Sequence, residues 1–386
     1  MKRLSLFTCG AVAVAAMVCG PSPASAQKLP ETMTFTAYDT GTSGFNITVA
    51  VGKAFKEKAG TDIRVLPAGN DVARLAPLKA GRAQVSSMGV GTFFAMEGLV
   101  EFATKEWGPQ ALQLILTSID CNGGGLATAA DANIKTMKDL KGKRVGFVVG
   151  SPALNQNTLA MMAFAGLTTA DVKSVEFASY GAMWKGLVNN DVDAAFGSTV
   201  TGPAKEAETS PRGIFWPPVP HSDKEGWARL VKIGPYFIQH KATCGAGGIS
   251  PEKPLEMGSF PYPIYTVYAS MSEDMAYGIT KTMISGYDIY KDAVPGASGL
   301  GADKQTKNYV LPFHPGAIKA LKEAGQWSAS DQAHADKLYA RQKVLGEAWA
   351  GFMKTSPPDD KDAFRKAWME ARKAALTKAG METIID

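Results

Sequence analysis

The chain has 386 residues, of which 45% are hydrophobic and 20% are charged, and its formal net charge is +5. This length is more than a single hydrophobic core usually serves, so we expect two lobes or domains. The charge is mild and the basic residues are scattered, which argues against an arm that binds nucleic acid.

The first 26 residues have the pattern of a secretory signal peptide. Lys2 and Arg3 form a basic start, an apolar stretch runs from about Ala11 to Val18, and Ala24-Ser25-Ala26 is a small-residue cleavage site. The apolar stretch is shorter than the ~20 residues that a spanning helix needs, so we favour cleavage after Ala26 over a membrane anchor. We therefore expect an exported, periplasmic protein.

Two cysteines, Cys121 and Cys244, lie beyond this segment. In an oxidising compartment they allow one disulfide, and two buried free thiols are the alternative. We favour the disulfide. It would close a long loop and restrict the unfolded chain by roughly 4–5 kcal/mol.

The next elements alternate between strand and helix patterns. We expect strands at Met33 to Ala37, Thr61 to Leu66 and Ala83 to Met88, with helices at Thr48 to Lys58 and Val72 to Ala80 between them. Such a βαβαβ order predicts a parallel sheet with right-handed crossovers.

The same order begins again in the middle of the chain, which predicts a second lobe. We expect strands at Arg144 to Val149, Val172 to Phe177 and Val192 to Phe196, with helices at Thr158 to Ala165 and Met183 to Val188. The segment GSPALNQN before the first of these helices is expected to be a loop.

The remainder is less regular. Residues Thr201 to Pro263 are rich in Gly and Pro, so we expect loops with one strand or helix near Trp227 to Ile238. A strand at Ile264 to Ser270 and a helix at Met275 to Lys291 follow. The tail, Ser328 to Asp386, predicts two helices separated at Ser356-Pro357-Pro358.

The loop AYDTGTSGFN after the first strand resembles an anion-binding loop at the start of a helix. It lacks the Lys-Ser/Thr pair of a P-loop, the dinucleotide spacing G-x-G-x-x-G, and the G-x-S-x-G of a nucleophile elbow. Its hydroxyls and backbone N–H groups suit a carboxylate. A tight turn that binds nothing is the alternative.

Ligands in parallel α/β sheets bind beyond the carboxyl ends of the strands. Small polar loops follow the strands of both units, so we expect two faces that close on a small molecule. Arg74 could pair with a ligand carboxylate or could lie in solvent. The candidate ligand-binding residues are Thr40, Thr42, Ser43, Asn46, Gly69, Asn70, Arg74, Ser87, Gly89, Val90, Gly91, Ser151, Asn155, Tyr180, Ser198 and Thr199.

Signals for metal binding and catalysis are weak. The four histidines, His221, His240, His314 and His334, have no metal-ligand spacing, so we expect no metal, no cofactor and no enzymatic activity. The aromatic runs Trp216 to Pro220 and Phe260 to Pro263 could line a cleft or form rigid surface loops. We expect Trp327, Trp349 and Trp368 in the tail to be packing anchors.

Several segments in order resemble the TAXI family of solute-binding proteins, the extracytoplasmic receptors of TRAP transporters. The resemblance covers about Met33 to Gly325 and rests on GTSGFN, LPAGNDVARLAPLKAGRAQVSSMGVG, IKTMKDLKGKRVGFVVGS, FAGLTTADVKSVEFASYGAMWKGLVNNDVDAAFGS and LPFHPGAIKALKEAG. The chain departs from the family pattern in three ligand loops, at Thr42 to Asn46, at Gly89 and at Gly150 to Leu154.

The resemblance implies a type II periplasmic-binding-protein clamshell of two βαβ lobes joined by a hinge, here with a C-terminal helical extension. The expected boundaries are 27–121 and 248–325 for the first lobe, 122–247 for the second and 326–386 for the extension. The implied function is a monomeric receptor that captures a carboxylate-bearing solute, an organic acid or acidic amino acid, and delivers it to a TRAP-type membrane permease. The alternatives are a sensory receptor, or a periplasmic hydrolase with Ser43 or Ser151 as nucleophile.

Overall fold

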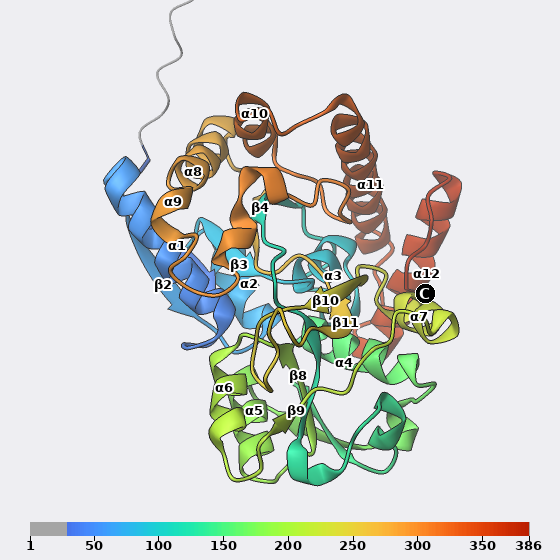
Figure 1. Ribbon diagram of the computed structural model, residues 1–386. Helices are drawn as coiled ribbons and strands as arrows, with labels where there is room; N and C mark the ends of the chain where they lie inside the picture. The colour runs from blue at the N-terminus through green and yellow to red at the C-terminus, as the bar shows by residue number, and fades with distance from the viewer. Residues whose placement is uncertain (1–28, 386) are drawn as a thin grey trace, which may run out of the picture.

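The computed structural model describes residues 29–385, so the predicted signal peptide lies outside the described residues. Figure 1 shows an α/β protein with two lobes and a helical extension at one side. Within residues 29–385, no helix combines the length and the hydrophobicity needed to cross a membrane.

The first lobe is built on a five-stranded sheet in the order β2-β1-β3-β12-β4. Strands β1, β2 and β3 run parallel, and β12 pairs antiparallel with β3 and β4. The strands are β1 Thr32–Ala37, β2 Asp62–Pro67, β3 Val85–Met88, β4 Leu112–Thr117 and β12 Ile264–Tyr268; the helices are α1 Ser43–Ala59, α2 Asp71–Lys79, α3 Gly91–Glu97, α8 Glu273–Ser285, α9 Tyr287–Tyr290 and α10 Pro315–Glu323.

The second lobe repeats this plan. Its sheet has the order β10-β11-β5-β8-β6-β7, with β9 beside β5. The parallel set β7-β6-β8 is again followed by an antiparallel strand, β5, which enters from the other lobe. The strands are β5 Gly124–Ala129, β6 Arg144–Val148, β7 Lys173–Phe177, β8 Ala194–Ser198, β9 Ile214–Phe215, β10 Ile238–Ala242 and β11 Leu255–Ser259; the helices are α4 Pro152–Phe164, α5 Tyr180–Val188, α6 Gly202–Thr209 and α7 Lys224–Ile233.

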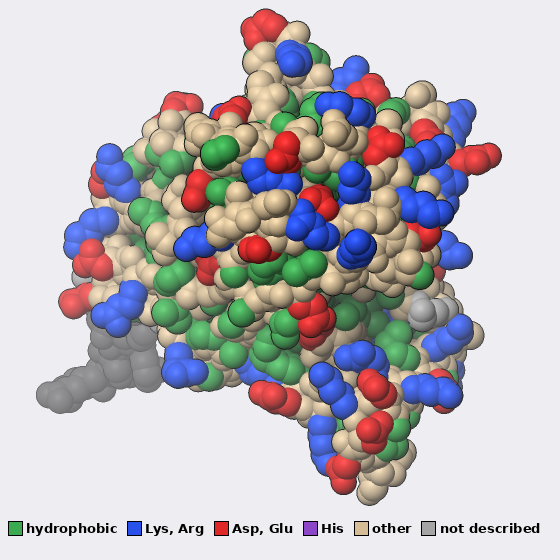
Figure 2. All heavy atoms as spheres, turned by 90° about the horizontal axis from the view of Figure 1, so that it is seen from below, with side chains coloured by type: hydrophobic (Ala, Val, Ile, Leu, Met, Phe, Trp, Pro, Cys, Tyr) green, Lys and Arg blue, Asp and Glu red, His purple; other side chains and the backbone are tan. Residues whose placement is uncertain are grey.

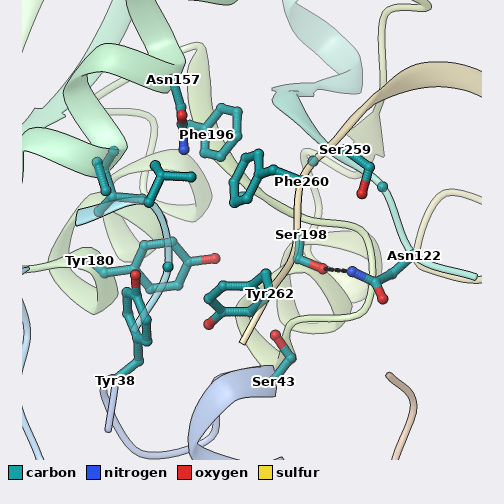
Figure 3. A pocket seen from close by; sticks show the side chains of 17 residues that line it. Tyr38, Ser43, Asn122, Asn157, Tyr180, Phe196, Ser198, Ser259, Phe260 and Tyr262 are labelled. Carbon is teal, nitrogen blue, oxygen red and sulfur yellow. Dashed lines mark hydrogen bonds between the residues drawn. The ribbon is translucent and has the colours of Figure 1, made fainter. Parts of the chain in front are cut away.

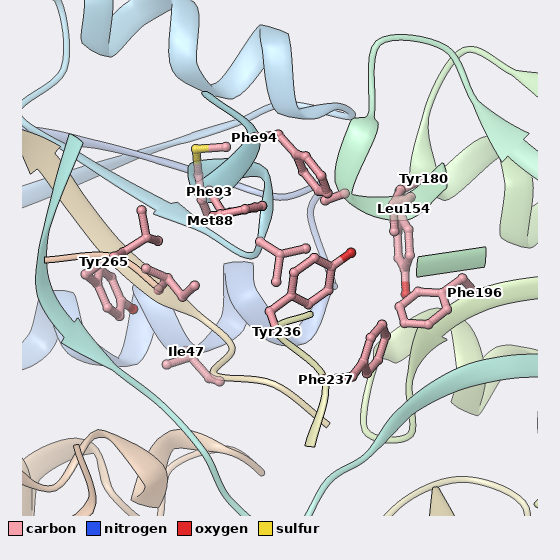
Figure 4. Close-up of a cluster of buried hydrophobic side chains, with 14 of the residues drawn as sticks. Ile47, Met88, Phe93, Phe94, Leu154, Tyr180, Phe196, Tyr236, Phe237 and Tyr265 are labelled. Carbon is pink, nitrogen blue, oxygen red and sulfur yellow. The ribbon is translucent and has the colours of Figure 1, made fainter. Parts of the chain in front are cut away.

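Because each sheet receives its fourth strand from across the hinge, the chain has the predicted type II periplasmic-binding-protein clamshell fold. The apolar core continues from one lobe into the other. Figure 4 shows Tyr236 between Phe93 and Phe94 of the first lobe and Phe237 of the second. The Tyr236 ring lies 5.9 Å from Phe94 and 5.3 Å from Phe237, between ring centroids.

Helices α1, α4 and α5 begin well before their predicted starts, and their first turns contain residues that were assigned to loops. Helix α1 begins at Ser43 because the Thr42 side chain accepts a hydrogen bond from the Phe45 N–H. Helix α5 begins at Tyr180 because Ser179 caps it in the same way. Helix α4 begins at Pro152, in the segment predicted as a loop, because proline suits the first helical position.

The predicted return to the first lobe at residue 248 is wrong. Strand β11 still belongs to the second sheet, where it pairs with β10 and β5, so the chain crosses back through Phe260 to Pro263. The Gly- and Pro-rich composition of this region suggested loops. Helix α7 is the one element expected near Trp227 to Ile238, whereas α6, β10 and β11 were not recognised because their sequences lack a clear apolar period.

The two tail helices are confirmed, as α11 Ala329–Met353 and α12 Lys361–Lys378, with the break at the predicted prolines. The extension packs on the end of α3. The Trp368 indole N–H donates to the Gly98 carbonyl at 2.7 Å, and the carboxylate of Glu97 binds the guanidinium groups of Arg341 and Arg372. Trp349 and Trp368 therefore act as packing anchors, as predicted.

The predicted disulfide is confirmed, with 5.4 Å between the Cα atoms of Cys121 and Cys244. It joins the segment before β5 to the segment after β10, where the Thr243 N–H also donates to the Cys121 carbonyl at 2.8 Å.

On the face that Figure 2 shows, basic and acidic side chains are interspersed, without a large area of one sign.

Candidate functional site

A cavity of about 50 Å³ lies where the two lobes meet. Tyr38, Ser43 and Val90 line it from the first lobe, while Phe196 and Ser198 line it from the second. Figure 3 shows the aromatic rings of both lobes around this space. The other lining residues are Gly89, Asn122, Gly123, Gly124, Ala153, Leu154, Asn157, Tyr180, Gly197, Ser259, Phe260 and Tyr262.

The lining of this cavity is uncharged. None of its residues is Asp, Glu, Lys, Arg or His. Burial raises the pKa of Tyr262 to about 12 and the pKa of Tyr180 and Tyr38 further above the ordinary value. All three hydroxyls therefore stay protonated and neutral at physiological pH.

Two carboxylates of the first lobe occupy helix N-termini of the second lobe. One oxygen of Asp71 accepts from the backbone N–H of Ala153, in the first turn of α4, at 2.8 Å, and from the Ser151 hydroxyl at 3.3 Å. An oxygen of Asp39 accepts from the Gly181 N–H, in the first turn of α5, at 3.0 Å. A helix N-terminus attracts negative charge, so these contacts hold the lobes together.

Arg74 is fully buried. Of the two alternatives that the sequence left open, a side chain in solvent is therefore excluded. Its guanidinium binds the carboxylate of Asp71, donates to the Ala68 carbonyl at 3.1 Å, and lies 3.2 Å above the centre of the Tyr38 ring. It does not line the cavity. In this closed arrangement, the guanidinium of Arg74, which was considered as a partner for a ligand carboxylate, is bound to the carboxylate of Asp71.

Gly69, after β2, and Gly202, at the start of α6, allow the lobes to approach each other closely. A Cβ atom at Gly69 would lie 2.5 Å from the Cβ of Ser179, and one at Gly202 would lie 2.3 Å from the Gly41 carbonyl oxygen. The Tyr180 N–H donates to the Gly69 carbonyl at 3.1 Å. The small residues of these loops therefore serve contact between the lobes.

We expect Gly69→Ala to favour an open arrangement of the lobes. Its Cβ would meet Ser179 only when the lobes are closed, and overpacking of this kind costs about 1–3 kcal/mol. Small-angle X-ray scattering should show a larger radius of gyration than for the wild type. Gly346→Ala in α11, where a Cβ meets nothing within 4 Å, is the control and should leave the radius unchanged. Equal radii for all three proteins would contradict this account of closure.

Five of the predicted contact residues line the cavity: Ser43, Gly89, Val90, Tyr180 and Ser198. The rest have structural contacts or lie outside it. Thr42 and Asn70 cap helices, Asn155 bonds both backbone groups of Val148, and Thr199 donates to the Cys244 carbonyl. The remaining predicted residues that do not line the cavity are Thr40, Asn46, Gly69, Arg74, Ser87, Gly91 and Ser151.

The residues that the sequence analysis missed are mostly aromatic or lie at the crossings between the lobes. Phe260 and Tyr262 belong to the run that could line a cleft or form a rigid loop, and the structure places both in the lining. Asn122 and Gly123 follow the disulfide cysteine on the outward crossing. Asn157 comes from helix α4, in the segment predicted as a loop. Only the aromatic–proline run gave a signal that sequence reasoning could have used.

The histidines lie apart from the cavity. His314 caps α10, where its Nδ1 accepts from the Gly316 N–H at 3.1 Å. Within residues 29–385, no group of three or more His, Cys, Asp or Glu residues is placed to hold a metal ion. The hydroxyl of Ser151 donates to Asp71, and no histidine is among the residues around Ser43 in the cavity.

Comparison with known families and structures gives the following matches. Residues 42–217 match a family model described as NMT1/THI5 like, and residues 261–325 match a model of the NMT1-like family. The alkanesulfonate-binding protein SsuA from Xanthomonas axonopodis pv. citri, bound to MOPS, is 16% identical with a TM-score of 0.42, over 82% of this chain and 95% of that chain. An amino acid ABC transporter substrate-binding protein from Streptococcus pneumoniae, bound to L-arginine, is 10% identical with a TM-score of 0.43. The match covers 70% of this chain and 95% of that chain.

Proposed function

We propose that this protein is an extracytoplasmic receptor that closes its two lobes on a small solute and hands the solute to a membrane permease. The observation that carries the proposal is the cavity itself, which is walled by both lobes and by the two crossings between them. A solute held there contacts both lobes at once. It therefore binds the closed arrangement better than the open one and shifts the population towards closure.

The permease is of the TRAP type in this proposal, and the receptor acts as a monomer in the periplasm. Support comes from the sequence segments that resemble the TAXI family and from the signal-like pattern of the first 26 residues. The family models that match residues 42–217 and 261–325 carry other descriptions, so the type of permease rests on the resemblance alone.

A carboxylate-bearing solute is the class that the sequence favours, and one feature of the cavity supports it. Ser43 lies in the first turn of α1 and lines the cavity, where its hydroxyl offers a donor beside a helix N-terminus. The lining has no cation to balance the charge of a carboxylate, so the cavity supports this class through Ser43 alone.

The test uses protein purified without denaturation. We expect mass spectrometry after denaturing release to find one small molecule at near-stoichiometric amount. Returning that molecule to stripped protein at about 100 times its dissociation constant should raise the free energy of unfolding by about 2.7 kcal/mol. If no small molecule is carried and no solute of any class stabilises the stripped protein, the receptor proposal fails.

A further inference from the structure

The walls of the cavity are largely aromatic. Tyr38, Tyr180 and Tyr262 gather on one side, with Phe196 and Phe260 on the other, as Figure 3 shows. The rings of Phe196 and Phe260 are nearly parallel, with 13° between their planes and 6.5 Å between their centroids. Tyr38 and Tyr262 meet edge to face at 5.4 Å. Aromatic walls of this kind favour a flat apolar group over a flexible polar chain.

Three helix N-termini at the junction of the lobes, those of α4, α5 and α1, already face an oxygen atom of the protein. Asp71 accepts from the first turn of α4, and Asp39 accepts from the first turn of α5. The Tyr262 hydroxyl lies at the start of α1, where a Cβ on Gly44 would come within 2.6 Å of it. These three positions, which would otherwise suit a solute carboxylate, are therefore filled from within the chain.

The charged groups near the cavity are also paired within the chain. Asp71 is fully buried and bound to Arg74, which is also fully buried and stacks on the Tyr38 ring. Moving an unpaired carboxylate from water into such a site is unfavourable. The lining thus selects against a charged solute, in a cavity whose size already restricts it to a small one.

Asn157 places a donor beside the aromatic walls. The side-chain oxygen of Asn157 accepts from the Tyr236 hydroxyl at 2.8 Å. Among the described residues no group accepts from its amide nitrogen, which Figure 3 shows on the side of Phe196. Asn157 is therefore placed to donate to a carbonyl or ring acceptor of a bound solute.

We infer that the solute presents an uncharged single aromatic ring with a hydrogen-bond acceptor, held between the Phe196 and Phe260 side and the tyrosines, with its acceptor at Asn157. This inference rests on the proposed receptor function, and it replaces the carboxylate class that the sequence favours with an uncharged class of solute. The closed cavity of about 50 Å³ is smaller than the ~150 Å³ that holds benzene in a protein interior. The lobes or the aromatic side chains must therefore move apart slightly to admit the ring.

The test compares two probes, one neutral and one anionic, that have nearly the same shape. Benzamide and benzoate are titrated into stripped wild-type protein by calorimetry, with succinate and glutamate as carboxylates without a ring. We expect benzamide to bind at least tenfold more tightly than benzoate, and the two aliphatic acids to bind no better than benzoate. Benzoate, succinate or glutamate binding more tightly than benzamide would overturn the inference while leaving the receptor function intact.

Two variants make the assignment specific. Asn157→Asp keeps the acceptor for Tyr236 and removes the donor, so we expect benzamide affinity to fall at least tenfold. Thermal unfolding of the stripped variant shows separately how much the buried carboxylate destabilises the fold. Asn308→Asp, at an exposed position outside the lining, is the matched control and should bind as the wild type does. Unchanged benzamide affinity in Asn157→Asp would overturn the placement.

If neither benzamide nor benzoate binds while a carried solute of another class does, the proposed class of an uncharged aromatic ring is wrong. If nothing binds, the receptor function itself fails.

Discussion

Glu97→Ala should destabilise the protein by at least about 3–5 kcal/mol, the cost of removing one partner from a buried ion pair. Glu97 is fully buried and binds two guanidinium groups: Arg341 through its Nε at 2.5 Å, and Arg372 through an Nη at 2.5 Å. Arg372 is itself fully buried. The substitution would leave two cations without their carboxylate between the first lobe and the extension. Denaturant titration of the free energy of unfolding measures the effect.

Glu347→Ala is the matched control on α11. Glu347 makes an exposed pair with Lys343 at 4.0 Å, and such pairs contribute between 0 and about 1 kcal/mol. The triple variant Glu97→Leu, Arg341→Leu and Arg372→Leu removes all three charges and keeps apolar side chains in their place. Because apolar replacement of a buried ionic group is often neutral, we expect its free energy of unfolding to change less than that of Glu97→Ala. If Glu97→Ala costs no more than Glu347→Ala, the extension is not held to the first lobe through this carboxylate.

Cys121→Ala with Cys244→Ala should lower the free energy of unfolding by about 5 kcal/mol in the chain-entropy model. The two cysteines are 123 residues apart, so the bridge restricts nearly the whole second lobe in the unfolded chain. Denaturant titration of the double variant beside the wild type gives the difference. Adding a reductant should reproduce the loss in the wild type and leave the double variant unchanged.

Peptide mapping without reduction provides the direct check on the bridge. We expect one linked pair of peptides, with Cys121 in one and Cys244 in the other. Alkylation of both thiols in protein that was never reduced would contradict the disulfide. A stability loss below about 1 kcal/mol would instead mean that residual structure in the unfolded chain already restricts this segment.

The architecture could be predicted because it follows from repeated local patterns. The two βαβαβ orders, the disulfide pair and the two tail helices with their proline break all depend on short segments of sequence. The strands β10 and β11 could not be recognised in the same way. Strand β10 carries the exposed polar residues Gln239 and Lys241, and only the pairing of the two strands with each other and with β5 makes them strands.

The candidate site was predicted less well because closure of the lobes decides which residues face the cavity. Small polar loops at strand ends were expected to contact a ligand, yet Gly69 and Ser151 contact the other lobe. Arg74 was considered for a solute carboxylate, and its partner is Asp71, three residues away. Phe260 and Tyr262 line the cavity because the chain recrosses there, which depends on the second sheet ending at β11.

The most direct test of the central claim is hydrogen–deuterium exchange on stripped protein with and without the solute that the purified protein carries. The account predicts simultaneous protection of segments from both lobes, near Ser43 and Val90 in the first and near Asn157 and Phe196 in the second. Protection confined to one lobe, or a solute that protects a segment outside the cavity, would contradict it.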